Sequence, residues 1–157
     1  MISLIVAMDE NGLIGNEGDI PWHIPKDFEL FKNYTKNNII IMGRKTWDSL
    51  PKKPLPHRIN IVISRSNNKL PGAEVFSSIE NAINYCNENF KKDIFFIGGT
   101  TIYGEGIKYC DHMHISHVKG KFQGDTHFPN IDWNEWNSEY TEEYDKFKFI
   151  LYQRIKS

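Results

Sequence analysis

The feature that most constrains the fold is an alternation of short apolar runs with segments of helical periodicity, which continues as far as residue 109. The run over residues 2–8 is apolar almost throughout, as expected of a strand that is buried on both faces of a sheet. Similar runs follow at residues 39–42, 59–64 and 93–97. This alternation of strands and helices predicts a mostly parallel sheet with helices packed on it.

Helices are predicted between these runs from their start signals and their spacing. Pro25 suits the first turn of a helix, and the apolar residues after it recur at three- and four-residue intervals. Ser78 has the side chain of a helix N-cap. Further helical segments follow Gly43 and the pair Gly98-Gly99.

The pattern changes after residue 109. Residues 112–118, 138–144 and 148–156 alternate loosely between apolar and polar side chains, with no helical segment between them. This alternation predicts antiparallel strands at one edge of the sheet. The predicted fold class is therefore an α/β sandwich whose sheet is mostly parallel and ends in an antiparallel C-terminal edge.

Composition and charge exclude several classes of function. A chain of 157 residues with 39% hydrophobic and 25% charged side chains is typical of one globular domain. Nineteen basic and twenty acidic side chains give a net charge of −1, so no global field draws the protein to nucleic acid or to an anionic membrane. No apolar run reaches the roughly 18 residues of a membrane span, and the N-terminus lacks the basic start of a signal peptide.

The two cysteines, Cys86 and Cys110, are too few for a disulfide framework. Free thiols in a reducing compartment are the simplest interpretation, so we expect a cytoplasmic protein. No exposed apolar stripe is legible in the sequence, and we therefore expect a monomer without an obligate protein partner.

Several strand ends are suited to binding an anion. Gly43 is followed by Arg44 and Lys45, and Arg65 follows the third apolar run. The pair Gly98-Gly99 stands between a strand and a helix, where it either admits a phosphate to the backbone amides or only forms a tight turn. Neither G-x-x-x-x-G-K-[ST] nor G-x-G-x-x-G occurs, which disfavours a P-loop kinase and an ordinary Rossmann dehydrogenase.

Arginine is used sparingly, with four arginines among nineteen basic residues. Arg44 and Arg65 follow buried runs, and Arg58 lies in a proline-rich loop that enters one. A planar guanidinium can grip phosphate or carboxylate through two hydrogen bonds, and the alternative is that these side chains only decorate the surface. Arg44 and Arg65 together suggest a site for an extra phosphate, such as the ribose 2′-phosphate of NADP.

Asp27 is the carboxylate in the first turn of the helix that Pro25 opens, and Trp22, Ile24 and Phe28 are close to it in sequence. A carboxylate at this position is stabilised by the helix dipole and needs no other purpose. The functional alternative is a carboxyl group in an apolar pocket. Desolvation would raise its pKa, so that it could hold a polar ligand and help to deliver a proton.

The histidines do not support a metal site. His112 and His114 share one face of a predicted strand, but no third ligand with suitable spacing is evident, and an exposed edge-strand face is the favoured interpretation. No Ser-His-Asp or Cys-His arrangement can be argued from spacing, so nucleophilic catalysis has no support.

Taken together, these segments resemble the dihydrofolate reductases, from the first strand to the last. The stretches that carry the resemblance are Ile2-Ser3-Leu4-Ile5-Val6-Ala7, Ile14-Gly15, Ile20-Pro21-Trp22-His23-Ile24-Pro25-Lys26-Asp27, Met42-Gly43-Arg44-Lys45-Thr46-Trp47, Pro54-Leu55-Pro56-His57-Arg58, Ile97-Gly98-Gly99 and Gly124-Asp125-Thr126-His127-Phe128-Pro129. Found together in this order, in a chain of this length, these stretches are highly specific for that family. The resemblance implies one domain over residues 1–157, a three-layer sandwich with about eight strands and about four helices, in which residues 38–108 form approximately an adenosine-binding lobe.

The reaction that the resemblance implies is hydride transfer from NADPH to the imine carbon of dihydrofolate, with protonation of the adjacent nitrogen, giving tetrahydrofolate. Asp27 would hold the pterin edge and promote protonation, Trp22 would order a water nearby, and Ser116 would hydrogen-bond toward the carboxylate. Arg58 would hold the α-carboxylate of the substrate's glutamate. The other substrate-binding residues implied are Ile5, Phe28, Phe31, Leu50 and Leu55.

The resemblance also implies a site for NADPH at the strand ends. The loop 14–20 would contact the nicotinamide, the turn at Gly98-Gly99 would take the pyrophosphate, and Arg44 with Arg65 would take the 2′-phosphate. The implied cofactor-binding residues are Ala7, Ile14, Gly15, Asn16, Gly18, Asp19, Ile20, Gly43, Arg44, Lys45, Thr46, Ser64, Arg65, Ile97, Gly98, Gly99, Thr100, Thr101, Ile102 and Tyr103. Residues 9–24 would act as a mobile lid that excludes water.

The chain departs from the family pattern at few positions. Thr100 stands where a third glycine often follows the pair, Thr101 where some relatives carry an arginine, and Ser116 where threonine is common. Two alternatives share part of the pattern: a reductase of this fold that acts on a pyrimidine of riboflavin synthesis, and a non-catalytic module that binds NADPH or folate. Asp27 with Arg58 argues against the first, because that substrate has no glutamate tail. The complete set of lid, carboxylate and clamps argues against the second.

Overall fold

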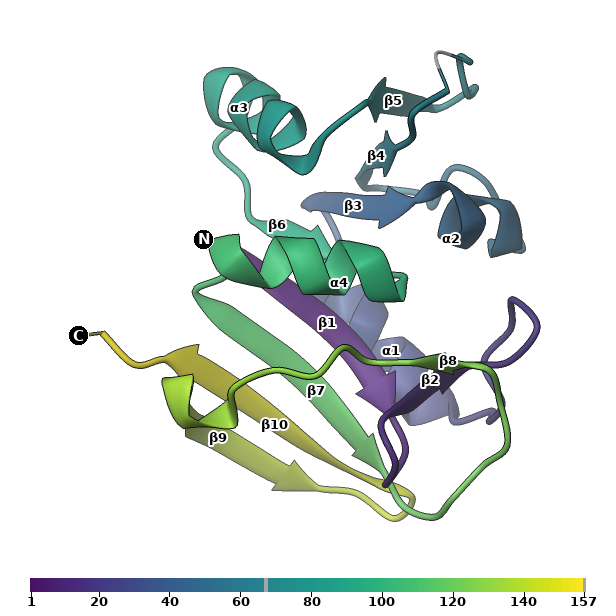
Figure 1. The fold of residues 1–157 in the computed structure, drawn as a ribbon, viewed down its shortest axis with the longest axis vertical. Coiled ribbons are helices and arrows are strands. Elements are labelled where there is room, and N and C mark those ends of the chain that lie inside the picture. The colour runs from purple at the N-terminus through teal and green to yellow at the C-terminus, as the bar shows by residue number, and fades with distance from the viewer. Residues whose placement is uncertain (67, 157) are drawn as a thin grey trace.

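Eight strands form one sheet across the middle of the molecule in the computed structural model, which describes residues 1–66 and 68–156 (Figure 1). In spatial order they are β5 (Ala73–Phe76), β4 (Ile59–Ile63), β3 (Ile39–Gly43), β6 (Ile94–Phe96), β1 (Ile2–Met8), β7 (His112–Val118), β10 (Phe147–Arg154) and β9 (Trp136–Glu143). Neighbours from β5 to β7 are parallel, whereas β10 pairs antiparallel with both β7 and β9. The prediction of a mostly parallel sheet with an antiparallel end is confirmed.

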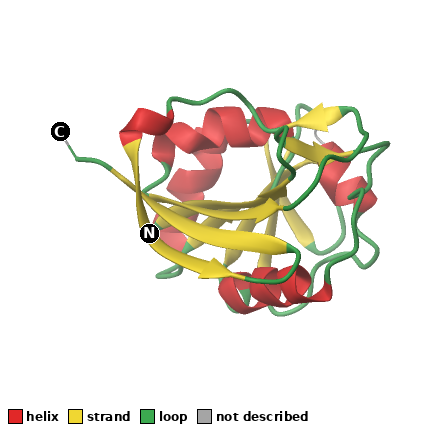
Figure 2. Cartoon of the chain, turned by 90° about the horizontal axis from the view of Figure 1, so that it is seen from below, coloured by secondary structure: helices red, strands yellow, loops and turns green. Residues whose placement is uncertain are grey.

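Helices cover both faces of this sheet, which gives the three layers of the predicted sandwich. α1 (Pro25–Thr35) lies on one face, and α3 (Ile79–Asn89) and α4 (Thr100–Gly106) lie on the other (Figures 1 and 2). The shorter elements are α2 (Arg44–Ser49), which directly follows β3, and the 3-10 turns η1 (Ile107–Tyr109) and η2 (Trp133–Glu135).

The central strand β3 shows how the apolar runs build the core. Its residues from Ile39 to Met42 are completely buried, as predicted for a strand covered on both faces. Alternate side chains point to opposite faces. Ile39 and Ile41 therefore join the core cluster that contains residues of α3 and α4, and Ile40 and Met42 join the cluster on the side of Phe31 in α1.

The local start signals of two helices are confirmed. Pro25 is the first residue of α1. The N–H that proline lacks would have no partner within the helix at this position, so its loss costs no hydrogen bond. Ser78 is the N-cap of α3, and its Oγ accepts a hydrogen bond of 3.1 Å from the N–H of Asn81. Both helices therefore begin where the sequence places them.

The strand predicted over residues 112–118 is present as β7, but it does not belong to the antiparallel edge. β7 pairs parallel with β1, from Ser3 opposite His112 to Met8 opposite His117, and only β10 and β9 form that edge. The expectation of an exposed face for His112 and His114 is wrong, because both are buried. Their face of β7 is covered by α1, whose Tyr34 ring lies 4.6 Å from the His114 ring.

A small second sheet pairs two segments that the sequence patterns did not identify as strands. β2 (Leu13–Gly15) pairs antiparallel with β8 (Thr126–His127), which brings residues after β1 beside residues after β7. Their shortness explains why no periodicity revealed them. Among the helices that the structure describes, none has the length and apolar character needed to cross a membrane.

Candidate active site

The carboxyl ends of four parallel strands meet at one edge of the sheet, where ligands bind in open α/β folds. β1 ends at Met8, β3 at Gly43, β4 at Ile63 and β6 at Phe96. The backbone N–H of Gly43 donates to the carbonyl of Gly98 at 2.9 Å, which joins two of these ends directly. Gly43, Ser64 and Ile97, which end or follow these strands, are thus gathered at one edge.

Asp27 lies in the first turn of α1, where its backbone N–H donates to the carbonyl of Ile24 at 3.0 Å. Its Oδ1 accepts a hydrogen bond of 2.6 Å from the hydroxyl of Ser116 on β7. Burial raises the pKa of the Asp27 carboxyl, and the bond from Ser116 opposes part of that rise. The raised pKa makes this carboxyl easier to protonate than an ordinary aspartate.

Ala7 lies on β1, the strand that leads into the predicted lid, and it is close to the residue that binds Asp27. In the pairing of β1 with β7, Ala7 lies directly opposite Ser116. A ligand above Ala7 would therefore be close to the hydroxyl that binds Asp27. Proximity of this kind is what a transfer between two bound molecules requires.

Apolar side chains surround the region between α1 and the loop before β4. Phe31, Leu50 and Leu55 are partly buried and pack against the cluster that contains Ile5. Phe28 does not join them: its ring is 41% exposed and lies 5.6 Å from the ring of His23. The structure thus brings together four of the five predicted apolar residues, whereas Phe28 is exposed.

Arg58 is fixed at the far end of this apolar region. Its Nη1 donates to the hydroxyl of Thr35 at 3.1 Å, and its Nε donates to the carbonyl of Pro56 at 2.9 Å. The guanidinium carbon lies 5.9 Å from the centre of the Phe31 ring. Partial burial lowers the pKa of Arg58 from its ordinary value, but an arginine remains charged.

Trp22 is buried in a different cluster, with Ile24, Val118 and aromatic residues of β10. The centre of its ring lies 5.2 Å from that of Phe122. Its indole Nε1 is buried and has no hydrogen-bond partner within the described chain. A buried donor of this kind needs a partner, so the group is available to a polar ligand or a water.

The turn between β6 and α4 is open because glycines form it. The peptide bond between Gly98 and Gly99 is cis, and Gly98 has a φ of 129°, which side chains rarely adopt. A Cβ at Gly98 would lie 3.4 Å from the hydroxyl oxygen of Thr46 and 3.5 Å from that of Tyr103. A side chain would therefore fill the space beside Thr46 that a phosphate of a dinucleotide needs, and the residues present fit such a group.

Other residues predicted to bind the cofactor hold this turn together. Tyr103 is buried and its hydroxyl donates to the carbonyl of Ile5 at 2.8 Å. The backbone N–H of Ile97 donates to the carbonyl of Ile41 at 3.0 Å. The hydroxyl of Thr100 donates to the carbonyl of His127 at 2.7 Å. Their contacts within the protein position the turn, and the neighbouring residues Thr101 and Ile102 lie in the first turn of α4.

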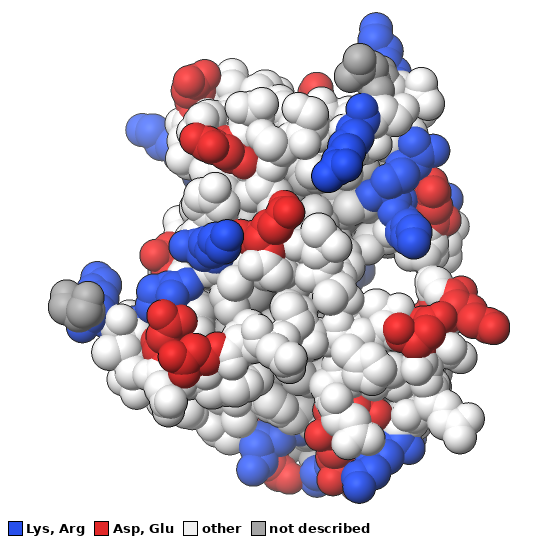
Figure 3. Space-filling model, in the orientation of Figure 1, with Lys and Arg blue, Asp and Glu red and all other residues white. Residues whose placement is uncertain are grey.

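Basic side chains flank the turn on the side of α2 and the β4–β5 end of the sheet, where Lys and Arg gather on the surface (Figure 3). Arg44 and Lys45 open α2, and the Nε of Arg44 lies 3.0 Å from Oδ1 of Asp48. Ser64 and Arg65 follow β4, and the N–H of Ser64 donates to the carbonyl of Phe76. The exposed charges suit an anionic ligand that lies over these strand ends.

Two carboxylates that sequence reasoning gave no role organise the segment 9–24. Asp9 is only 3% exposed, and its carboxylate accepts backbone N–H bonds from Asn11, Leu13 and Phe122 at 2.8–2.9 Å. These bonds outweigh burial and lower the pKa of Asp9. Asp125 accepts two bonds from the N–H of Glu17, at 3.1 and 3.3 Å.

These contacts place the predicted lid residues. Asn16 and Asp19 form a short backbone bridge, which leaves Gly18 in the exposed tip and Ile20 43% exposed. Ile14 and Gly15 belong to β2. The sequence around the tip does not reveal that Asp125 binds Glu17, because the two residues are more than a hundred positions apart.

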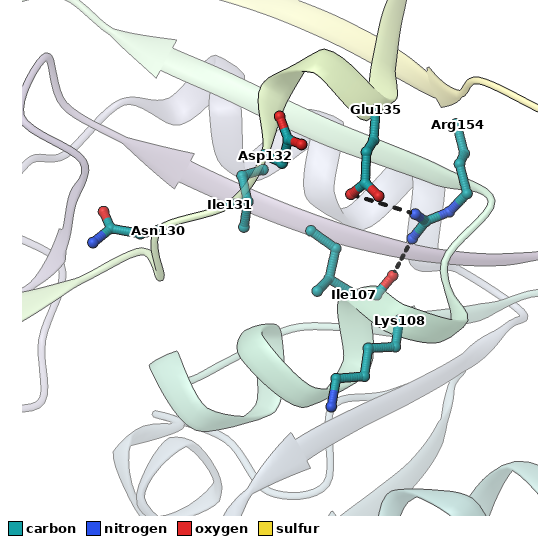
Figure 4. Close-up of a pocket in the computed structure, with 7 residues that line it drawn as sticks. All are labelled: Ile107, Lys108, Asn130, Ile131, Asp132, Glu135 and Arg154. Atoms are coloured by element: carbon teal, nitrogen blue, oxygen red, sulfur yellow. Dashed lines mark hydrogen bonds and ion pairs between the residues drawn. The ribbon is translucent and has the colours of Figure 1, made fainter.

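One hollow described in the structure lies away from this edge of the sheet. A cavity of about 360 Å³ lies between η1 and the segment that leads into η2, at the end where β7 begins (Figure 4). Its Arg154 donates to the carbonyls of Cys110 and Ile107 and lies 4.0 Å from a Glu135 oxygen. These bonds make Arg154 a structural residue. No group of three potential metal ligands occurs among residues 1–66 and 68–156.

Comparison with known proteins agrees with this architecture. The family model of dihydrofolate reductase matches residues 1–154. The chain is 37% identical to the dihydrofolate reductase of Bacillus subtilis (strain 168), over 100% of this chain and 96% of that protein. It is 42% identical to that of Neisseria gonorrhoeae, over 96% of this chain and 93% of that protein.

A solved structure matches over nearly the whole chain. It is the dihydrofolate reductase from Enterococcus faecalis complexed with NADP(H) and RAB-propyl, with a TM-score of 0.92 and 32% sequence identity. The match covers 99% of this chain and 97% of that one. The fold and the edge of the sheet described above are those of an oxidoreductase that uses a nicotinamide cofactor. The chain belongs to the dihydrofolate reductase family, and its activity is the NADPH-dependent reduction of dihydrofolate.

Proposed function

We propose that Asp27 is the proton-handling group in the reduction of 7,8-dihydrofolate to 5,6,7,8-tetrahydrofolate. The observation that carries the proposal is the 2.6 Å bond from Ser116 to Asp27 at the start of α1, combined with burial that raises the pKa of the carboxyl. A carboxyl with a raised pKa shares a proton more readily near neutral pH than an ordinary aspartate does.

Asp27 holds the amino-pyrimidine edge of the pterin through paired hydrogen bonds and favours protonation of the nitrogen beside the imine carbon. Ser116 donates to Oδ1, and Oδ2 accepts no hydrogen bond from the described residues, so it can bind the ligand. Trp22, whose Nε1 has no partner within the described residues, holds a water near the same edge. Asp27, Trp22 and Ser116 are thus the proposed catalytic set, in which Ser116 acts through Asp27.

The rest of the substrate lies along the apolar region between α1 and the loop before β4. Ile5, Phe31, Leu50 and Leu55 line it, and Phe28 covers its mouth. Arg58 binds the α-carboxylate of the glutamate at the far end, supported by its bonds to Thr35 and Pro56. A charged contact of this kind contributes roughly 1.5–3 kcal/mol.

The strand-end edge holds NADPH, which supplies the hydride when it is bound. The turn at Gly98-Gly99 and Thr46 take the pyrophosphate, because the glycines leave room there. Arg44 and Arg65 take the 2′-phosphate. Residues 38–108, which contain β3 to α4, form the lobe that binds the adenosine half.

The segment 9–24 excludes water from the site during hydride transfer. Ile14, Gly15 and the tip from Asn16 to Ile20 cover the nicotinamide side, next to Ala7. The bonds from the N–H of Glu17 to Asp125 support a position of the tip over the site.

We further propose that the protein acts as a monomer in the cytosol. Cys86 and Cys110 are both free and buried, which supports a reducing compartment. The large hydrophobic side chains that are exposed are scattered over separate elements, from Ile20 to Tyr140 and Ile155.

The test compares the wild-type protein with Asp27→Asn. Wild-type protein should lower the absorbance of NADPH when dihydrofolate is added. At neutral pH, Asp27→Asn should reduce turnover by roughly 10²–10⁴-fold, with partial recovery in acid, where the substrate is protonated in solution. Glu29→Gln removes an exposed carboxylate from the same helix and should leave turnover unchanged. Full turnover of Asp27→Asn at neutral pH would remove Asp27 from the mechanism.

A further inference from the structure

The hydroxyl of Thr100 joins two segments that are 27 residues apart in the chain. It donates to the carbonyl of His127 at 2.7 Å. Thr100 is the first residue of α4 and directly follows the pair Gly98-Gly99, whereas His127 belongs to β8. The bond therefore connects the turn that is proposed to take the pyrophosphate with the small second sheet.

One face of α4 packs along the chain that follows β8 (Figure 1). The ring centres of Tyr103 and Phe128 are 5.5 Å apart, and a Cβ at Gly104 would lie 3.7 Å from the Cβ of Pro129. Thr100 shares this face, because residues three and four positions apart are neighbours on a helix. The apolar contacts hold the segment against α4, and the directional bond from Thr100 fixes one of its carbonyls.

β8 is in turn attached to the beginning of the proposed lid. It pairs antiparallel with β2, with His127 opposite Leu13. The backbone N–H of Phe128 donates to the carbonyl of Gly12 at 2.8 Å. The residue whose carbonyl Thr100 holds is therefore also the strand partner of a lid residue.

The same segment reaches the tip of the lid through Asp125. Its backbone N–H donates to the carbonyl of Gly15 at 3.2 Å, and its carboxylate accepts the bonds of 3.1 and 3.3 Å from the N–H of Glu17. Contacts thus run without a break from Thr100 through β8 to both ends of the lid's exposed part.

We propose that Thr100 is a positioning residue that transmits occupancy of the pyrophosphate turn to the lid. The inference rests on the proposed function, because it takes the turn at Gly98-Gly99 as the pyrophosphate site and residues 9–24 as the lid. A phosphate bound at the turn fixes the backbone that carries Thr100. Ordering one partner of a hydrogen bond lowers the cost of ordering the other, so the carbonyl of His127 becomes more rigid.

The transmission needs the hydroxyl of Thr100 and no contact between the ligand and the lid. β8 and β2 become more rigid together with His127, because the two strands are paired. A glycine at position 100 would leave the turn intact but would have no hydroxyl to donate. The phosphate half of the cofactor alone therefore stiffens the lid in this chain.

The test uses 2′-phosphoadenosine 5′-diphosphate, which carries phosphates of the adenosine half of NADPH and lacks the nicotinamide. Amide hydrogen exchange of the full chain is measured with and without a saturating concentration of this probe. Thr100→Val removes the hydroxyl and keeps the shape of the side chain, whereas Thr100→Ser keeps the hydroxyl. Thr141→Val is the matched control, because Thr141 is an exposed residue of β9 whose hydroxyl lies 3.3 Å from that of Ser138.

In the wild-type protein the probe should slow exchange at the turn, over residues 98–103, and also over residues 12–17 and 125–128. The slowing at the two distant segments should be about two- to tenfold, as expected for the net effect of one hydrogen bond. Thr100→Val should keep the slowing at the turn and lose it at the distant segments. Thr100→Ser and Thr141→Val should both show the wild-type pattern.

Two results would overturn the role of Thr100: slowing at the lid that persists in Thr100→Val, or a wild-type protein in which the probe protects the turn and leaves the lid unchanged. Thr100→Ala also lacks the hydroxyl and decides the same question if Thr100→Val does not fold. Failure of the proposed cofactor site is a separate outcome, because the probe would then leave exchange at the turn itself unchanged, and the transmission would be refuted with it.

Discussion

Replacing His114 with phenylalanine should protect the fold against acid. His114 is 6% exposed, and the rings of Tyr34, Phe95 and Phe149 surround it at centre distances of 4.6, 5.4 and 6.2 Å. Burial, with a smaller contribution from the neighbouring His112, lowers the pKa of His114 from 6.5 to about 4. The aromatic surroundings accept a phenylalanine, which keeps the ring contacts and removes the titrating group.

The size of the effect follows from the difference between the two pKa values. Above pH 6.5 the imidazole is neutral in the folded and the unfolded chain, and it contributes no pH dependence. As the pH falls from 6.5 to about 4, only the unfolded chain gains the proton at His114, so the free energy of unfolding decreases. At about 1.4 kcal/mol for each pKa unit, the loss reaches about 3 kcal/mol. This is a large part of the roughly 5–15 kcal/mol by which small domains are stable.

The assay is urea unfolding of the wild-type protein and His114→Phe, followed by circular dichroism, at a pH above 6.5 and at a pH near 4. The stability difference between the two proteins should move by about 3 kcal/mol in favour of the variant at the lower pH. His23→Gln, which removes an exposed imidazole, serves as the control. A difference between wild type and His114→Phe that stays constant with pH would refute the assignment of a buried, neutral histidine.

Two further predictions concern the cofactor site and the core. Replacing Arg44 and Arg65 together with glutamine should raise KM for NADPH by about tenfold or more while leaving KM for NADH nearly unchanged, because only NADPH carries the 2′-phosphate; an equal loss with both cofactors would point to a folding defect. Gly106→Ala would place a Cβ 2.8 Å from the Phe96 ring, so overpacking should destabilise the fold by about 1–3 kcal/mol, measured as a lower Tm. An unchanged Tm would show that α4 moves aside without cost.

The elements that the sequence predicted well are those with local signals. β1 and β3 are short apolar runs, and the first turns of α1 and α3 are marked by Pro25 and Ser78. In each case the physical cause lies within a few residues: burial on both faces for the strands, and backbone geometry or an N-cap bond for the helices. Such features do not depend on which segment packs against which.

What could not be predicted from patterns depends on pairing between distant segments. The loose alternation of residues 112–118 is compatible with an edge or an interior strand, and only the pairing with β1 and β10 makes β7 interior. The burial of His112 and His114 follows from that pairing and from α1 above them. A lone strand pattern contains neither fact.

The candidate site divides in the same way. Asp27 was singled out by its place in the first turn of α1, but two interpretations stayed open on the residues alone. The bond from Ser116, 89 residues further along the chain, gives that carboxyl a fixed partner in the structure. Asp9 received no role, because its importance lies in three backbone N–H groups that no side-chain motif reveals. The roles of the individual cofactor-binding residues remain predictions.

The carboxylate of Asp9 anchors the start of the segment that follows β1. Its two oxygens accept hydrogen bonds from the N–H groups of Leu13 and Phe122, which follow β1 and β7, so a movement of the tip around Gly18 would leave this end of the segment anchored. The strand before Asp9 pairs with β7, and Ala7 lies opposite Ser116 in that pairing. A movement of the tip alone would therefore leave the bond from Ser116 to Asp27 unchanged.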